Sequence, residues 1–238
     1  LFIKDIRNNG VFFETKPTTS GSNTASSIIF STPDAERSMN TFLGACVELE
    51  PNDINPILVK NSEISYLEGY LFDPPKAKEA FYKVADIAKS NKNLVAMSLS
   101  DSFCIERHRK DFLSFILDNV DILFTNEEEA KSLFECELEQ AKKNFEDFNI
   151  EVALTLGEKG SNILRDGKWF DIKPIVLGNV EDTTGAGDLY ASGYLFGRSC
   201  GKNAKECGKI GSIVAGEIIT QIGSRPKKDL KSLVNNLK

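Results

Sequence analysis

From residue 60 onward, short apolar segments alternate with longer amphipathic ones, and this alternation limits the fold more than any other feature. The segments typical of buried strands are Ile64–Gly69, Leu94–Leu99, Val120–Phe124 and Val152–Leu156. The segments between them are helix-like: one carries Phe81, Val84, Ala85 and Ala88 on a single face, another runs from Glu106 to Leu117, and a third follows Asn126. Such alternation predicts right-handed crossovers and a mostly parallel sheet covered on both faces.

Two other parts of the chain favour antiparallel pairing. Ile163–Phe170 contains Asp166-Gly167, which predicts a hairpin with a type I′ turn. Near the start, a helix over Leu1–Arg7 ends at Asn8-Asn9-Gly10. Strands are expected at Val11–Thr15, Thr24–Ser31 and Ser38–Leu43, with a turn at Thr32–Glu36. No helices separate these strands, so residues 11–45 are expected to form a β-rich flap, or lid.

Composition excludes several classes of protein. The 238 residues suit one domain with a small appendage, and the net charge of -6 with no basic stripe argues against a nucleic-acid partner. No apolar run approaches the roughly 20 residues that span a bilayer, so no membrane partner is expected. His108 is the only histidine, which disfavours zinc sites and Ser-His-Asp catalysis. The five cysteines lack C-x-x-C spacing and are expected to be free thiols in the cytoplasm.

The run Asp182-Thr183-Thr184-Gly185-Ala186-Gly187-Asp188 precedes an apolar helix and carries the clearest chemistry. The first N–H groups of a helix are unpaired and bear partial positive charge, and small residues let an anion approach them. Gly185, Ala186 and Gly187 are therefore candidates for an anion hole. Asp188 would face the same anion as a proton acceptor. A bare G-x-G-D, however, is more often a glycine-rich turn with an Asp near a helix start.

Three further motifs carry weaker signals. Thr155, Gly157 and Gly160 follow a buried strand, where either a nucleotide loop or a plain β-turn fits. Asn126 and Glu129 begin a helix, where an acidic run also serves as a cap and favours the helix dipole. Arg37 in the flap is either a surface residue or a phosphate-facing one.

The complete run from Asp182 through Ser192-Gly193-Tyr194-Leu195 resembles the C-terminal signature of the ribokinase-like (PfkB) family of sugar and nucleoside kinases. Thr155–Gly160 is similar to that family's T-x-G-x-x-G loop, and Asn126–Glu129 to its N-x-x-E motif. The segment Glu36-Arg37 is similar to its G-E-R segment. The resemblance implies a three-layer α/β/α core with a small β-rich lid.

The resemblance also implies ATP and Mg²⁺ as cofactors. Asp188 would be the catalytic base, Asn126, Thr155, Gly157 and Gly160 would serve the nucleotide, and Glu129 would hold Mg²⁺ through water. Asp182 and Thr184 match positions that help to hold a monovalent cation such as K⁺ in such proteins.

The likeness extends from about Val11 to Pro226, and segments such as Leu67-Glu68-Gly69-Tyr70 look most like adenosine-kinase-like bacterial members. The family's N-terminal strand with a substrate-binding Asp and its G-G-x-x-x-N segment are not in this sequence. We therefore expect residues 1–238 to form a single PfkB-type domain without its N-terminal part, with the nucleotide and catalytic half at residues 120–226.

The expected activity is phosphorylation of a primary hydroxyl of a ribonucleoside or sugar, with an adenosine-like acceptor favoured. A non-catalytic nucleotide- or nucleoside-binding regulator and an assembly subunit remain alternatives, because fold does not fix function. Either a monomer or a homodimer formed through the lid is expected. No G-x-x-x-x-G-K-[S/T] and no Rossmann G-x-G-x-x-G after a first strand occur, which disfavours P-loop kinases and dinucleotide oxidoreductases.

Overall fold

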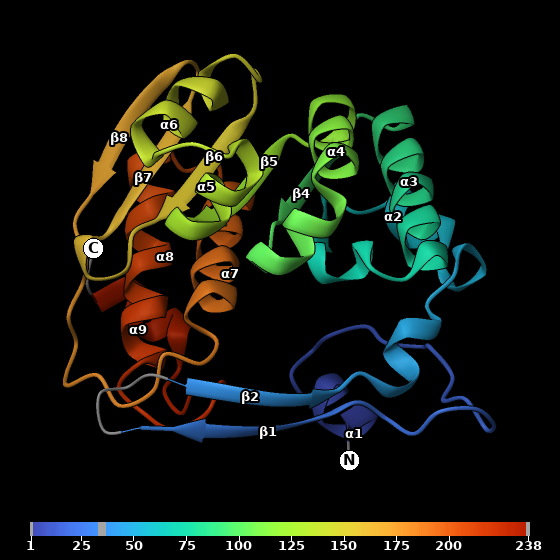
Figure 1. The fold of residues 1–238 in the computed structure, drawn as a ribbon. Coiled ribbons are helices and arrows are strands. Elements are labelled where there is room, and N and C mark those ends of the chain that lie inside the picture. Colours follow the sequence, from blue (N-terminus) through green and yellow to red (C-terminus); the bar gives the residue numbers. More distant parts are fainter. Residues whose placement is uncertain (1, 33–36, 237–238) are drawn as a thin grey trace.

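The computed structural model describes residues 2–32 and 37–236, and its largest element is a six-stranded sheet (Figure 1). The strands lie in chain order: β3 (Ile64–Glu68), β4 (Leu94–Ser98), β5 (Ile122–Asn126), β6 (Glu151–Thr155), β7 (Ser161–Arg165) and β8 (Lys168–Ile172). The pairs from β3 to β6 are parallel, and β7 and β8 add antiparallel pairs. The expected mostly parallel sheet is thus confirmed.

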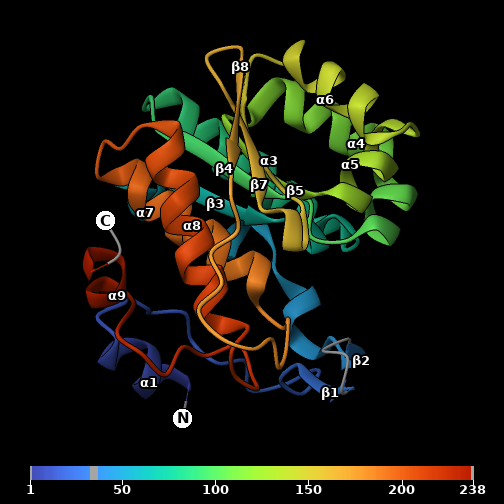
Figure 2. The same ribbon diagram turned by 90° about the vertical axis from the view of Figure 1, so that its left-hand side faces the viewer.

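Helices cover both faces of this sheet. One layer contains α3 (Pro75–Ser90), α4 (Ser102–Asn119), α5 (Glu127–Phe134) and α6 (Leu138–Glu146), and the other contains α7 (Ala186–Ser199) and α8 (Ala204–Ile218). Figure 2 shows α7 and α8 on one side of the strands and α4, α5 and α6 on the other. Successive strand residues point to opposite faces. In β5, Leu123 packs into the first layer, whereas Ile122 and Phe124 pack with the second.

The β7–β8 hairpin turns as its sequence predicts. Asp166 and Gly167 have φ angles of 52° and 70°, and a two-residue loop with both angles positive is the type I′ turn. The carboxyl ends of the parallel strands carry Glu68, Asn126 and Thr155. Ligands of such sheets bind at this edge.

The flap is a separate antiparallel ribbon of β1 (Ser26–Ser31) and β2 (Arg37–Phe42), which lies below the sheet in Figure 1. Every residue of both strands is exposed. The turn expected at Thr32–Glu36 falls largely on residues 33–36, which lie outside the described residues. The strand expected at Val11–Thr15 is wrong, because this segment is irregular. There the Phe13 carbonyl accepts the Arg7 guanidinium, at 2.8 Å from Nη2, instead of a neighbouring strand.

Short helices complete the chain: α1 (Phe2–Asn8), α2 (Pro56–Lys60), α9 (Leu230–Asn236) and the 3₁₀ turns Gly44–Glu48, Pro51–Asp53, Gly69–Phe72 and Gly157–Lys159. The helix expected at the start is confirmed, with Leu1 outside the described residues. An ion pair between Asp5 and Arg225 joins α1 to the loop after α8. None of the helices in the described ranges is long and apolar enough to cross a membrane.

Candidate active site

The loop before α7 is built around the buried carboxylate of Asp182. Its Oδ1 accepts the Thr184 N–H at 2.9 Å and the Thr184 hydroxyl at 2.6 Å, and its Oδ2 accepts the Gly223 N–H at 3.0 Å. These donors lower the pKa of Asp182, with the Thr184 hydroxyl contributing most. The carboxylate therefore ties the loop after α8 to the start of α7 and holds Thr184 beside it.

Gly185 and Gly187 serve different purposes at the N-terminus of α7. Gly185 caps the helix with a φ of 83°, a conformation that glycine adopts without strain, and a Cβ there would lie 2.9 Å from Cβ of Ser224. A Cβ on Gly187 would meet no atom within 4 Å. Ala186 donates its N–H to the Thr183 carbonyl at 3.2 Å, whereas the N–H groups of Gly187 and Asp188 meet no acceptor among the described residues. Two donors at the positive end of a helix thus have no partner within the described part of the chain.

Asp188 is exposed in the first turn of α7, next to those donors. Burial raises the pKa of Tyr66, and the charges of Glu68 and Asp188 raise it further. Burial likewise raises the pKa of Glu68, and the charge of Asp188 adds to that increase. Asp188 therefore lies within electrostatic reach of Tyr66 and Glu68 at the carboxyl end of β3.

Asn126 and Glu129 form a reciprocal cap at the start of α5. The Asn126 Oδ1 accepts the Glu129 N–H at 2.8 Å, and Glu129 Oε2 accepts the Asn126 N–H at 3.0 Å. Burial raises the pKa of Glu129 to about 7, and the carboxylates of Asp101 and Glu68 contribute. The predicted helix cap at Asn126 and Glu129 is confirmed. The Glu129 carboxylate is nevertheless buried and close to other acidic residues.

A divalent cation suits this donor set, because carboxylate and amide oxygens are hard ligands. Within residues 2–32 and 37–236, no three acidic, histidine or cysteine side chains come together closely enough to hold a metal unaided. A Mg²⁺ ion at Asn126 and Glu129 would accordingly depend on water and phosphate oxygens for most of its ligands.

The Thr155–Gly160 loop lies beside Asn126, because Thr155 pairs with Asn126 in the β5–β6 register. Gly160 has a φ of 94°, and a Cβ there would lie 2.1 Å from the Ile172 carbonyl oxygen, so its role is structural. Gly157 has a φ of 57°, and a Cβ there would meet nothing within 4 Å. The open backbone at Gly157 is the part of this loop that a nucleotide could approach.

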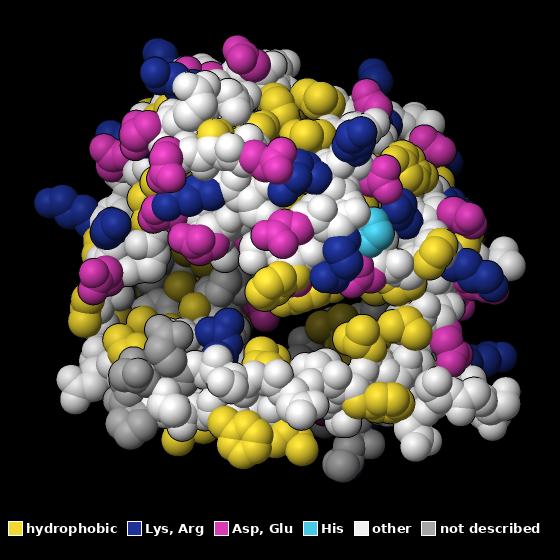
Figure 3. All heavy atoms as spheres, in the orientation of Figure 1, with side chains coloured by type: hydrophobic (Ala, Val, Ile, Leu, Met, Phe, Trp, Pro, Cys, Tyr) yellow, Lys and Arg dark blue, Asp and Glu magenta, His cyan; other side chains and the backbone are white. Residues whose placement is uncertain are grey.

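Arg37 brings the flap to the α7 loop. Its Nη1 donates to the Thr183 hydroxyl at 2.7 Å, across 146 positions of the sequence. Figure 3 shows a hollow between the flap and the rest of the molecule, with apolar side chains along its rim. The aromatic side chains of Tyr66, Tyr70 and Phe103 are exposed, and the pKa of Tyr70 is raised by burial and by nearby carboxylates that include Asp188.

Sequence reasoning missed Tyr66, Glu68 and Ser100 as parts of this site. Glu68 accepts a hydrogen bond from the Ser100 hydroxyl at 2.6 Å and another from the Tyr66 hydroxyl. The sequence signal that could have indicated Glu68 is its position as an acidic residue at the end of an apolar strand. Their grouping depends on the pairing of β3 with β4, which the sequence does not specify residue by residue.

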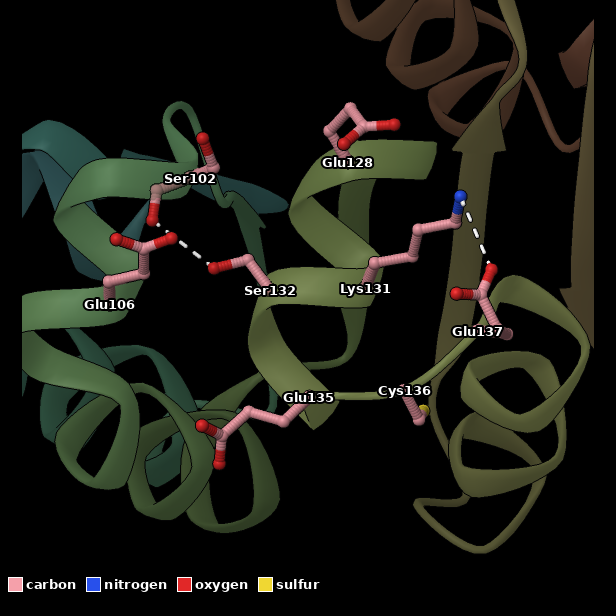
Figure 4. A pocket seen from close by; sticks show the side chains of 8 residues that line it. All are labelled: Ser102, Glu106, Glu128, Lys131, Ser132, Glu135, Cys136 and Glu137. Atoms are coloured by element: carbon pink, nitrogen blue, oxygen red, sulfur yellow. Dashed lines mark hydrogen bonds and ion pairs between the residues drawn. The ribbon is translucent and has the colours of Figure 1, made fainter.

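A separate hollow of about 380 Å³ lies between α4, α5 and the turn before α6 (Figure 4). The side chains of Lys131 and Glu137 point toward one another across it, 3.6 Å apart. None of its lining residues belongs to α7, the flap or the Thr155–Gly160 loop. This hollow is therefore not the candidate active site.

Comparisons with known proteins agree with this arrangement. A model of the pfkB family carbohydrate kinases matches residues 1–230. A probable sugar kinase from Rhizobium etli is 44% identical, with a TM-score of 0.96 over 99% of this chain and 72% of that one. The adenosine kinase from Sinorhizobium meliloti is 45% identical, with a TM-score of 0.96 over 100% of this chain and 73% of that one.

An uncharacterized sugar kinase from Archaeoglobus fulgidus is 37% identical over 111 residues. That match includes 46% of this chain and 44% of the relative, so less than half the length of this curated relative is spanned. Together, the matches confirm the expected ribokinase-like α/β/α fold.

Proposed function

Because the chain belongs to the pfkB family of carbohydrate kinases, we propose that it transfers the γ-phosphoryl group of ATP to a primary hydroxyl of a nucleoside or sugar. The observation that carries the proposal is the start of α7. There, two N–H groups without an acceptor among the described residues, an open glycine and an exposed carboxylate lie side by side. This combination suits an anion that must react with a hydroxyl.

The N–H groups of Gly187 and Asp188 would stabilise the negative charge that develops on the transferred group, together with the partial positive charge of α7. Preorganised donors of this kind need no rearrangement during the reaction. The Asp188 carboxylate would accept the proton of the attacking hydroxyl, which is the task of a general base in phosphoryl transfer. The alternative of a non-catalytic binder leaves an exposed carboxylate beside the anion hole without a purpose.

The nucleotide is proposed to lie between the carboxyl end of β5 and the loop after β6. Gly157 leaves backbone open for it, and Asn126 and Glu129 supply oxygen and nitrogen atoms near its phosphates. Mg²⁺, when bound, would neutralise phosphate charge. Glu129, with a pKa of about 7, is readily ionised by such a cation. A monovalent cation beside Asp182 and Thr184 is part of the same proposal.

The acceptor is proposed to be an adenosine-like nucleoside. Tyr66, Tyr70, Phe103, Met39 and Leu43 have exposed side chains, and we propose that these side chains contact the acceptor. A nucleobase buries such surface, whereas a free sugar is polar over its whole face. The adenosine kinase from Sinorhizobium meliloti supports the same choice. Cytoplasmic location and the oligomeric state stay predictions.

A coupled assay of ADP release would test the proposal across adenosine, cytidine, ribose and fructose. We expect the highest kcat/KM with adenosine and dependence on Mg²⁺. The matched control is 5′-deoxyadenosine, which lacks the primary hydroxyl and should inhibit competitively without stimulating ADP release. Nucleotide binding without phosphotransfer to any acceptor would contradict the proposed activity and favour a binding protein.

A further inference from the structure

Two buried hydroxyl groups join the start of α7 to the base of the Thr155–Gly160 loop. The side chains of Tyr190 and Ser161 share a hydrogen bond, with 2.7 Å between their oxygen atoms. Tyr190 is only 4% exposed and Ser161 only 1%. Because both side chains are inaccessible, they are not candidates for contact with a substrate. Their bond instead connects two elements that each carry part of the candidate active site.

Ser161 fixes one end of this bond in the sheet. It is the first residue of β7 and follows Gly160 directly. Ser161 pairs with Thr155, the last residue of β6. The Leu156 N–H donates to the Gly160 carbonyl at 2.8 Å, which closes the loop at its base. Ser161 therefore lies at the point where the candidate nucleotide loop returns to the sheet.

Tyr190 fixes the other end of the bond near the start of α7. It lies two positions after Asp188 and three after Gly187 in the same helix. The backbone of α8 presses on its ring, because a Cβ on Gly211 would lie 3.1 Å from two ring carbons and 3.0 Å from the Tyr190 carbonyl oxygen. A ring packed this closely has little freedom of its own. A bond to its hydroxyl therefore restrains the start of the helix.

A second polar contact holds α7 at the opposite edge of the sheet. Glu151, the first residue of the five-residue strand β6, accepts hydrogen bonds from the Tyr194 hydroxyl and from the Arg198 guanidinium. These donors lie one and two turns beyond Tyr190 on α7. Among the hydrogen bonds of the described residues, the one between Tyr190 and Ser161 is the bond that holds α7 beside the loop.

We propose that Tyr190 and Ser161 are positioning residues, whose hydrogen bond sets the distance between the anion donors of α7 and the loop that receives the nucleotide. Phosphoryl transfer needs both parts at once, because the loop would fix the nucleotide while the donors stabilise the charge on its terminal phosphate. A misplacement of about 1 Å between such parts can cost about 10²-fold in rate. This inference rests on the proposed function for its catalytic meaning, but the physical link can be measured without turnover.

The link is tested by hydrogen exchange of the Leu189 amide, followed by NMR in ¹⁵N-labelled protein. This N–H donates to the Gly185 carbonyl at 2.9 Å and closes the first turn of α7. We expect its exchange to accelerate about tenfold in Tyr190→Phe and equally in Ser161→Ala, although Ser161 belongs to another element. The matched control is Tyr194→Phe, which removes a buried hydroxyl one turn further along α7 and should leave Leu189 exchange unchanged.

Kinetics test the catalytic meaning of the link. In Tyr190→Phe, kcat should fall about tenfold, while the Kd for ATP by isothermal titration calorimetry stays within about twofold of the wild type, because neither buried hydroxyl reaches the nucleotide. Tyr194→Phe should show a comparable fall in Tm but a wild-type kcat. A purely structural role of Tyr190 would lower Tm in both variants and leave their kcat values equal, which would overturn the proposal.

The double variant Tyr190→Phe/Ser161→Ala distinguishes one shared bond from two independent effects. It should have the kcat and the Leu189 exchange rate of either single variant, because each substitution removes the same bond. Effects on kcat that multiply in the double variant would contradict the proposal. The double variant also leaves neither hydroxyl buried without its partner, so it is measured in place of a single variant that fails to fold.

The link and the proposed function can fail separately. Leu189 exchange that is the same in wild type, Ser161→Ala and the double variant would overturn the link. Absence of phosphotransfer in the wild type would instead reject the proposed function and with it the catalytic meaning of the bond, while the exchange measurement would still decide whether Ser161 restrains the start of α7.

Discussion

Two glycines two positions apart differ in what they require at the start of α7. Gly185 is needed for its backbone conformation and for the close approach of Ser224, whereas Gly187 is needed only if something must occupy the space before it. The sequence predicted both as parts of one anion hole. It could not separate them, because the crowding at Gly185 comes from a residue 39 positions later in the chain.

This difference gives a prediction at the residue scale. Gly187→Val should fold with nearly wild-type Tm, since its side chain enters open space, but it should lose phosphotransfer. Valine keeps the backbone N–H, so the loss would come from its side chain obstructing the phosphate; removal of one such donor typically costs about 10²–10³ in rate, and obstruction should cost more. Gly185→Val should instead be destabilised by at least about 1–3 kcal/mol, through backbone strain and the clash with Ser224. Differential scanning calorimetry and the coupled assay together measure both. Wild-type turnover by a folded Gly187→Val protein would show that the phosphate binds elsewhere.

Glu129 gives a second prediction at this scale. Its pKa is near 4.5 when unfolded and about 7 when folded, so its ionisation in the fold is disfavoured. The stability that protonated Glu129 supports is fully present below pH 4.5 and is lost as the pH rises through 7. Glu129→Gln should remove this loss, on the order of 1–3 kcal/mol between pH 5 and 8, in urea unfolding.

Glu129→Gln should also need more Mg²⁺ to reach half its maximal rate, because the cation is attracted to the ionised Glu129 carboxylate and the glutamine amide carries no charge. The matched control is Glu128→Gln, an exposed neighbour in the same first turn of α5. An unchanged Mg²⁺ requirement in Glu129→Gln would leave Glu129 with the capping role alone.

At the scale of elements, local sequence patterns predicted correctly those structures that depend on residues close together in the chain. The Asp166-Gly167 hairpin and the β1–β2 ribbon follow from turn residues and alternating strands. Val11–Thr15 has strand-like residues but no partner strand among the described residues, and its carbonyl at Phe13 is taken by Arg7. Strand composition indicates a preference, whereas a strand exists only where another strand lies within hydrogen-bonding distance.

The flap gives a prediction that belongs to this scale. Arg37 is the described flap side chain that bonds the α7 loop, through Thr183. Arg37→Ala should lower kcat/KM for ATP by about tenfold, and Arg37→Lys should recover part of it, because an arginine fork near phosphate gives charge-assisted hydrogen bonds. Arg7→Ala is the control, since Arg7 also bonds across an exposed loop but only to the Phe13 carbonyl. Equal kinetics for Arg37→Ala and wild type would assign Arg37 to the surface.

At the scale of the whole molecule, the layers can be predicted from the sequence, because the spacing of apolar residues in each strand and helix indicates which of its faces is buried. The candidate site is only partly predictable in this way. Recognisable sequence motifs contain Asp188, Gly187 and Asn126. In contrast, Glu68 and Ser100 become neighbours only because β3 pairs with β4. Long-range pairing creates contacts that a linear pattern does not contain.

The proposed reaction requires parts from across the chain to meet: the base on α7, the nucleotide loop after β6, and the flap that Arg37 joins to the α7 loop. The most direct measurement compares turnover and nucleotide affinity in Asp188→Asn, which keeps the shape of the side chain and removes its proton acceptor. We expect ATP binding by isothermal titration calorimetry to stay near the wild-type value, while kcat falls by about 10²–10⁴, the usual contribution of a general base. Near-normal turnover in Asp188→Asn would contradict the role of Asp188 as the base.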